Sequence, residues 1–230
     1  MAMKLLSKNN TKILKGEKIG IMTWGLSLAP HKLNGKINLC RYASAGCRAA
    51  CLYTSGHGAF SNVKAARLKK TMFFVEDQKN FILELGKEIS VAVKSARRAG
   101  MKCAIRLNVL SDVAWHELID FKKWPEVQFY DYTPNTPRMI EYLQGKLPEN
   151  YHLTFSRKEN NQNAVEIIAK MGGNVAVVFD KLPETYLGKP VVNGDETDVR
   201  FLDGKNVIVG LKAKGQGKKD SSNFVVKSPA

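Results

Sequence analysis

The stretch Cys103-Ala104-Ile105-Arg106-Leu107-Asn108-Val109 is the first of four short runs rich in strand-forming residues. The other three cover residues 127–132, 151–156 and 174–179, so the runs start about 23 to 24 residues apart. Short helices are predicted between and after them, at residues 114–122, 136–144 and 162–171. Serial βα units with right-handed crossovers build a parallel sheet. The sequence therefore predicts an α/β fold, a full or partial parallel (β/α) barrel like a TIM barrel.

The flanking segments extend this pattern. Residues 18–28 predict an interrupted strand, residues 77–99 an amphipathic helix with a core-facing apolar stripe, and residues 206–213 a last strand. A chain of 230 residues can bury one good core, so residues 1–230 are expected to form a single domain. The Gly-, Lys- and Ser-rich tail, residues 213–230, is expected to be mobile, with Phe224-Val225-Val226 as its anchor.

The alternation along the first run separates polar from apolar side chains. It places Arg106 and Asn108 on one face of the strand, and Cys103, Ile105 and Leu107 on the other. Cys103 is therefore expected to face the helices as a core residue. Arg106 and Asn108 need polar partners, and two interpretations stay open. They form an internal network with Asp131, Thr154 or Ser156, or they bind a ligand.

Parallel βα folds bind ligands at the carboxyl ends of their strands. Polar residues follow the predicted strands at these ends, and the predicted cofactor-binding residues are Asn108, Ser111, Asp112, Ser156 and Arg157. Asp112 also precedes the segment Val113-Ala114-Trp115-His116, where it is expected to be the N-cap of a helix.

Three of the four cysteines lie in one stretch, Asn38-Leu39-Cys40-Arg41-Tyr42-Ala43-Ser44-Ala45-Gly46-Cys47-Arg48-Ala49-Ala50-Cys51-Leu52-Tyr53. We call residues 38–58 the cysteine segment. Cys47 and Cys51 are four residues apart in an Ala-rich run, so both thiols are expected on one helical face, with Cys40 on the preceding loop. Three soft ligands suit a thiolate-bound metal. A [4Fe–4S] cluster fits best, because it accepts three protein thiolates and leaves one iron for another ligand.

Other interpretations of the cysteines stay open. A structural zinc ion usually takes four protein ligands, and the fourth would be His57, His31 or Cys103. A disulfide would need an oxidising compartment and would leave one of the three thiols unpaired. Small apolar thiols can also simply fill a core beside alanine. No apolar stretch resembles a signal peptide or a membrane span, so we expect a cytoplasmic protein.

The chain is strongly basic. Its 36 Lys and Arg residues against 21 Asp and Glu give a formal net charge of +15, which favours anionic partners: nucleic acid, a nucleotide or a small phosphorylated molecule. Residues 193–203 instead hold four carboxylates. This acidic segment predicts a turn-rich surface loop, a hard-cation site or a set of ion pairs to the basic rim.

A cysteine triplet after the first strand, followed by serial βα units, resembles the radical S-adenosylmethionine superfamily. The resemblance implies that Cys40, Cys47 and Cys51 bind a [4Fe–4S] cluster whose open iron takes the amino and carboxylate groups of S-adenosylmethionine. The triplet departs from the superfamily in its spacing. Six and then three residues separate the cysteines, where the superfamily has three and then two, and Ala50 stands where an aromatic residue is usual.

Most of the chain is similar to a family of uncharacterised bacteriophage proteins known by a gene-product number. The similarity rests on the context Ala43 to Cys47, on Arg106-x-Asn108-x-x-Ser111-Asp112, and on Gly194-Asp195-x-x-Asp198-x-Arg200. It implies a phage-encoded protein that acts in the host cytoplasm. Two functions are expected: a [4Fe–4S] protein doing redox or radical chemistry on an anionic small molecule or nucleotide, or a zinc-stapled or metal-free nucleic-acid-binding module.

Overall fold

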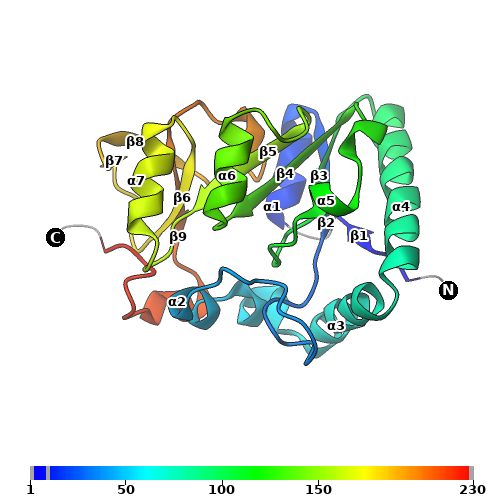
Figure 1. The fold of residues 1–230 in the computed structure, drawn as a ribbon, viewed down its shortest axis with the longest axis horizontal. Coiled ribbons are helices and arrows are strands. Elements are labelled where there is room, and N and C mark those ends of the chain that lie inside the picture. The colour runs from blue at the N-terminus through cyan, green and yellow to red at the C-terminus, as the bar shows by residue number, and fades with distance from the viewer. Residues whose placement is uncertain (1–2, 9–10, 228–230) are drawn as a thin grey trace.

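A nine-stranded sheet forms the centre of the structure (Figure 1), a computed structural model that describes residues 3–8 and 11–227. In spatial order its strands are β1 (Leu6–Ser7), β2 (Ile21–Leu26), β3 (Lys102–Arg106), β4 (Val127–Thr133), β5 (Tyr151–Ser156), β6 (Val175–Phe179), β9 (Ile208–Lys212), β8 (Lys189–Asn193) and β7 (Thr185–Tyr186). The strands from β2 to β8 in this order run parallel, whereas β1 and β7 pair antiparallel at the two edges.

The predicted α/β class and mostly parallel sheet are confirmed, but the sheet does not close into a barrel. Within the described residues, no strand pairing joins β1 to β7. The reason lies between β6 and β9, where residues 180–207 form strands β7 and β8 instead of another βα unit. These strands lie beyond β9, and a two-residue strand ends the sheet at each side.

The helices of the crossovers lie on one face of the sheet, as Figure 1 shows for α4, α6 and α7. The helices are α1 (Thr11–Leu14), α2 (Ala45–Ala49), α3 (Ser61–Glu76), α4 (Gln78–Arg98), α5 (Trp115–Leu118), α6 (Thr136–Leu143) and α7 (Gln162–Lys170). Short 3₁₀ helices cover Lys15–Ile19, Leu52–Thr54, Gly56–Ala59, Phe121–Lys123, Arg200–Leu202 and Gly215–Lys219.

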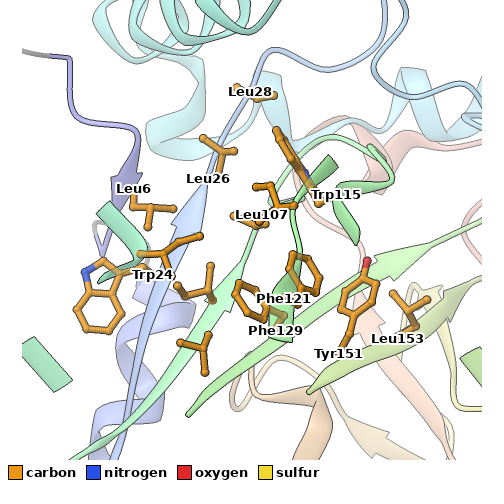
Figure 2. Close-up of a cluster of buried hydrophobic side chains, with 14 of the residues drawn as sticks. Leu6, Trp24, Leu26, Leu28, Leu107, Trp115, Phe121, Phe129, Tyr151 and Leu153 are labelled. Carbon is orange, nitrogen blue, oxygen red and sulfur yellow. The ribbon is translucent and has the colours of Figure 1, made fainter. Parts of the chain in front are cut away.

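The main core lies between this helical layer and the sheet, and Figure 2 shows part of it, including Trp115, Phe121 and Phe129. Helix α4 contributes Phe81, Leu85 and Ile89, all fully buried at the spacing that the sequence predicts. Phe121 stacks on Phe129 with ring centroids 4.0 Å apart. Each such side chain contributes about 1.5–3 kcal/mol when it is fully buried. This core fixes the strands whose carboxyl ends carry the candidate site.

The predicted alternation is confirmed from Cys103 to Leu107. Cys103, Ile105 and Leu107 are buried in the main core, and Arg106 projects from the other face of the sheet. That face carries α1 (Figure 1) and a second, smaller apolar cluster made by Ile21, Ala104, Tyr130 and Val199. Asn108, expected on the same face as Arg106, lies beyond the end of β3, and its Oδ1 accepts from Trp115 Nε1 of the main core instead.

Two local predictions are wrong. The helix expected at residues 114–122 is broken into α5 and the 3₁₀ helix Phe121–Lys123, because Ile119 is extended. Ala114, not Asp112, occupies the N-cap position of α5. The Asp112 carboxylate is instead paired with the Arg138 guanidinium, so it is not available for capping.

The C-terminal tail is packed over its described part. Phe224 and Val225 are buried, as expected of an anchor, and the Val226 N–H donates to the Val178 carbonyl over 2.8 Å. The mobility expected of residues 213–230 stays a prediction, and residues 228–230 lie outside the described part. None of the described helices combines the length and apolar character needed to span a membrane.

Candidate metal site at the carboxyl ends of the strands

The cysteine segment lies across the carboxyl-terminal edge of the sheet. Strand β2 ends at Leu26 and leads into it, and Figure 1 shows α2 and the start of α3 below the strands. Cys40 reaches the loop after β3, where its thiol donates to the Leu110 carbonyl over 3.3 Å. The topology thus brings the cysteine segment to the edge where ligands of parallel sheets bind.

Cys47 and Cys51 do not share a helix, which corrects the prediction from their spacing. Helix α2 begins after Ser44, whose Oγ accepts from the Cys47 N–H over 3.2 Å, and it ends at Ala49. Cys51 is extended because it starts the next turn, where its carbonyl accepts from the N–H and the hydroxyl of Thr54. The two thiols therefore come from consecutive turns of different helices.

The three thiols of the cysteine segment are free and half-buried. Burial, together with the charges of Asp112, Cys47 and Cys51, raises the pKa of Cys40 to about 12. Burial also raises the pKa of Cys51, where the charge of Cys47 acts in the same direction. Each of these sulfurs therefore lies within range of the charge of another thiolate of the segment.

Two backbone amides lie near the sulfurs. The amide of His31 lowers the pKa of Cys40 and the amide of Tyr53 lowers the pKa of Cys51, so both favour the thiolate. Lys158 and Arg67 lie near Cys51 and favour its thiolate through their charge. N–H donors and cations around half-buried sulfurs are the surroundings that thiolate ligands of a metal need.

Three thiols are chemically suitable donors for a thiolate-bound metal. Among the residues that the structure describes, no three His, Cys, Asp or Glu side chains converge as a metal-binding group. Cys47 packs against the small apolar cluster of Ala213, Phe224 and Val225. Cys103 is buried in the main core on β3, and the exposed His57 ring packs edge-on against Phe60.

Glu159 connects the cysteine segment to the loop after β5, and sequence analysis missed it. Its carboxylate accepts from the Gly46 N–H over 2.7 Å and from the Ser44 hydroxyl over 2.5 Å. Partial burial alone would raise the pKa of Glu159, but these hydrogen bonds lower it. The one available signal was a carboxylate directly after two basic residues at a predicted strand end.

Gly46 lies where the C-terminal tail approaches α2 closely. A Cβ atom at residue 46 would collide with Ser222 Oγ and lie 2.6 Å from Phe224 Cβ. The missing side chain therefore makes room for the C-terminal tail beside α2.

The predicted residues Asn108 and Ser111 organise the loop after β3. Asn108 Oδ1 accepts from Ser111 Oγ, the Val113 N–H and Trp115 Nε1, over 2.9, 2.9 and 3.1 Å. Asn108 Nδ2 donates to Asp131 Oδ2 over 3.0 Å. Of the two interpretations left open for Asn108, the structure contains the internal network with Asp131.

The other three predicted residues have different surroundings. Asp112 pairs with Arg138 and accepts from Thr133 Oγ1 over 3.0 Å, and its second oxygen has no hydrogen-bond partner in the described structure. It lies close enough to Cys40 to influence the thiol pKa. Ser156 and Arg157 follow each other at the end of β5, and Arg157 Nη1 donates to the Phe224 carbonyl over 2.9 Å.

The acidic segment makes ion pairs. Asp198, 1 % exposed, accepts from Arg106 Nη1 over 3.1 Å and from the Tyr130 hydroxyl over 2.9 Å, and Lys12 Nζ is 3.4 Å away. Burial alone would raise the pKa of Asp198, but the charges of Arg106 and Lys12 lower it. We call these four residues the Asp198 cluster. The expected surface loop is thus wrong for Asp198, whereas Asp195 pairs with Lys214 over 2.7 Å, as the ion-pair interpretation predicts.

Comparison with known protein families gives one result. The family described as Gene product 88 matches the chain over residues 4–228. Comparison with curated proteins gives no match, and comparison with solved structures gives none either.

Proposed function

We propose that this chain, which belongs to the Gene product 88 family, binds a [4Fe–4S] cluster through Cys40, Cys47 and Cys51. The match agrees with the resemblance to a gene-product family, and no radical S-adenosylmethionine protein is among the matches. The proposal covers binding of the cluster. It extends to redox or radical chemistry on an anionic small molecule or nucleotide in the cytoplasm of a phage host.

The observation that carries the proposal is the environment of the sulfurs. The three thiols are free and half-buried on one segment, and the backbone amides of His31 and Tyr53 lie near Cys40 and Cys51. Burial disfavours the thiolates of Cys40 and Cys51, so a bound cation would be the natural compensation. A cluster held by three thiolates supplies one-electron chemistry and one iron with an open coordination position.

The chain's own residues would hold and shield such a group. Lys158 and Arg67 add positive charge beside Cys51, which offsets the negative charge of thiolate ligands. Glu159 fixes the start of α2 and with it Cys47. Asp112, near Cys40 and with one oxygen unpartnered, is the side chain best placed to meet a ligand at this site. S-adenosylmethionine stays a candidate ligand from the superfamily resemblance alone.

The test is anaerobic purification followed by an optical spectrum with iron, sulfide and zinc analysis of the same sample. We expect a brown protein with about four irons and four sulfides per chain. Cys47→Ser should lose the iron and the colour. Cys103→Ser is the matched control, because it also removes one thiol but from the main core.

Two results would contradict the proposal. Equal iron content in Cys47→Ser and Cys103→Ser would show that the iron is not held by the cysteine segment. A colourless wild-type protein with about one zinc per chain would replace the cluster by a zinc site.

A second candidate function, nucleic-acid binding, has its own supporting observation. Lys64 Nζ and Arg67 Cζ each lie 5.6 Å from the centroid of the Tyr53 ring, which places basic and aromatic groups together beside α3. Cations and aromatic faces bind backbone phosphates and bases of single-stranded nucleic acid. It predicts DNA or RNA binding that weakens steeply with salt and with Lys64→Gln. An affinity that does not change with salt concentration would contradict nucleic-acid binding.

A further inference from the structure

A polar groove opens beside the cysteine segment and uses none of its thiols. It has a volume of about 300 Å³, within the range of small-molecule sites. Three pieces of chain surround it: the cysteine segment, the start of α6, and the loop after β5. Its lining residues are Arg41, Tyr42, Ala43, Ser44, Pro134, Thr136, Lys158, Asn160 and Asn161.

The lining is positively charged. Arg41 and Lys158 contribute two cations, and no carboxylate is among the lining residues. The nearest acidic residue in sequence, Glu159, is committed to Gly46 and Ser44. Lys158 is held in place, with its Nζ 5.2 Å from the centroid of the Phe224 ring. The electrostatics of the groove therefore favour an anion.

Two helices begin at the groove and add to this preference. Helix α6 starts at Thr136, and its N-cap Asn135 accepts from the Arg138 N–H over 3.3 Å. The N-cap residue of α7, Asn161, makes no capping hydrogen bond, because its side chain bonds the Lys158 N–H and the Ser156 carbonyl. In the described structure Asn161 therefore leaves the start of α7 uncapped, and uncapped amides at the start of a helix bind phosphate well.

An aromatic ring lines the same groove. Tyr42 is 49 % exposed, so its ring is accessible to a flat partner. Stacking of a base on an aromatic ring contributes about 1–3 kcal/mol. Cations, open amides and an open ring in one groove suit a phosphate group joined to a base.

We propose that this groove binds a nucleotide, with the phosphates between Arg41, Lys158 and the start of α7 and the base on Tyr42. This inference names a nucleotide as the ligand class of the proposed function. Only the reaction of the nucleotide after binding rests on that function. The groove itself contains no metal ligand, so nucleotide binding and cluster binding can fail separately.

The test is calorimetric titration of the full chain, purified anaerobically, with ADP and with inorganic phosphate. We expect ADP to bind more tightly than phosphate. Arg41→Gln and Lys158→Gln should each weaken both ligands about tenfold, the effect of losing one charge-assisted contact. Tyr42→Ala should weaken ADP alone. Lys170→Gln is the matched control, since it removes a cation from the opposite end of α7.

The remaining outcomes are decisive. No binding of either ligand, or equal loss in Lys170→Gln, would overturn the inference. Equal affinity for ADP and phosphate with no effect of Tyr42→Ala would overturn the assignment to a nucleotide. Cys47→Ser separates the two proposals: if the cluster is lost but ADP still binds, the groove stands alone. If wild type has its cluster but binds no ADP, only the groove is wrong.

Discussion

The Asp198 cluster lies on one face of the sheet, and the thiols of the cysteine segment lie at its carboxyl-terminal edge. The two sets of side chains differ in how their charges are compensated. Asp198 is buried with two cations and a tyrosine hydroxyl directed at it. The three thiols are half-buried, and the nearby cations Lys158 and Arg67 lower the pKa of Cys51 less than burial raises it. A buried polar group that is fully paired contributes to the fold, whereas one that is partly paired is suited to a ligand.

The largest effect should come from breaking the complete cluster. Asp198→Asn keeps the shape but removes the charge, and the largely buried Arg106 guanidinium then loses its anion. We expect a loss of about 3–5 kcal/mol in the free energy of unfolding, measured with urea. The exposed pair Lys36–Glu76 is the control, and Glu76→Gln should cost at most about 1 kcal/mol. Equal losses in the two variants would show that the Asp198 cluster is not structural.

A pH effect should come from His152, on the strand beside Tyr130. Burial lowers the pKa of His152 to about 4, against about 6.5 in the unfolded chain. The unfolded state therefore binds the proton first, and stability is lost as the pH falls from about 6.5 to about 4. The loss should reach up to about 3 kcal/mol, and His152→Gln should reduce it. Urea unfolding at a series of pH values checks this.

The exposed His57 provides the control for this pH series. His57→Gln should keep the wild-type loss of stability between pH 6.5 and pH 4. If His152→Gln and His57→Gln lose stability with the same slope, His152 is not the group responsible.

A smaller effect should come from the link between the cysteine segment and β5. Glu159→Gln weakens the acceptor for Gly46 and Ser44, at a cost of about 1 kcal/mol in unfolding. The same variant should lower iron content, because the start of α2 positions Cys47. Glu166→Gln, on the neighbouring helix α7, should change neither quantity. Unchanged iron content in Glu159→Gln would show that Glu159 does not support the metal site.

The main elements could be predicted because each has a local signal. The apolar spacing of Phe81, Leu85 and Ile89 identifies α4, and the alternation from Cys103 to Leu107 identifies β3 and its buried face. The open sheet could not be predicted, because it depends on residues 180–207, whose strands become stable only by pairing with β9.

The site was predictable in part for the same reason. The cysteine triplet and its place at the carboxyl ends of the strands follow from sequence order. Glu159 was missed because it acts on Gly46, 113 positions away in sequence. The break between Cys47 and Cys51 was missed because the Thr54 hydroxyl starts a new turn, which overrides the helix propensity of the alanines.

The most direct test of the proposed metal site is thermal unfolding of the anaerobic protein before and after removal of iron with a chelator. Metal binding to a folded site stabilises the fold, so iron removal should bleach the protein and lower its melting temperature. Cys47→Ser should melt at the lower temperature with or without chelator. A wild-type protein whose colour and melting temperature are unaffected by the chelator, and equal to those of Cys47→Ser, would contradict the account.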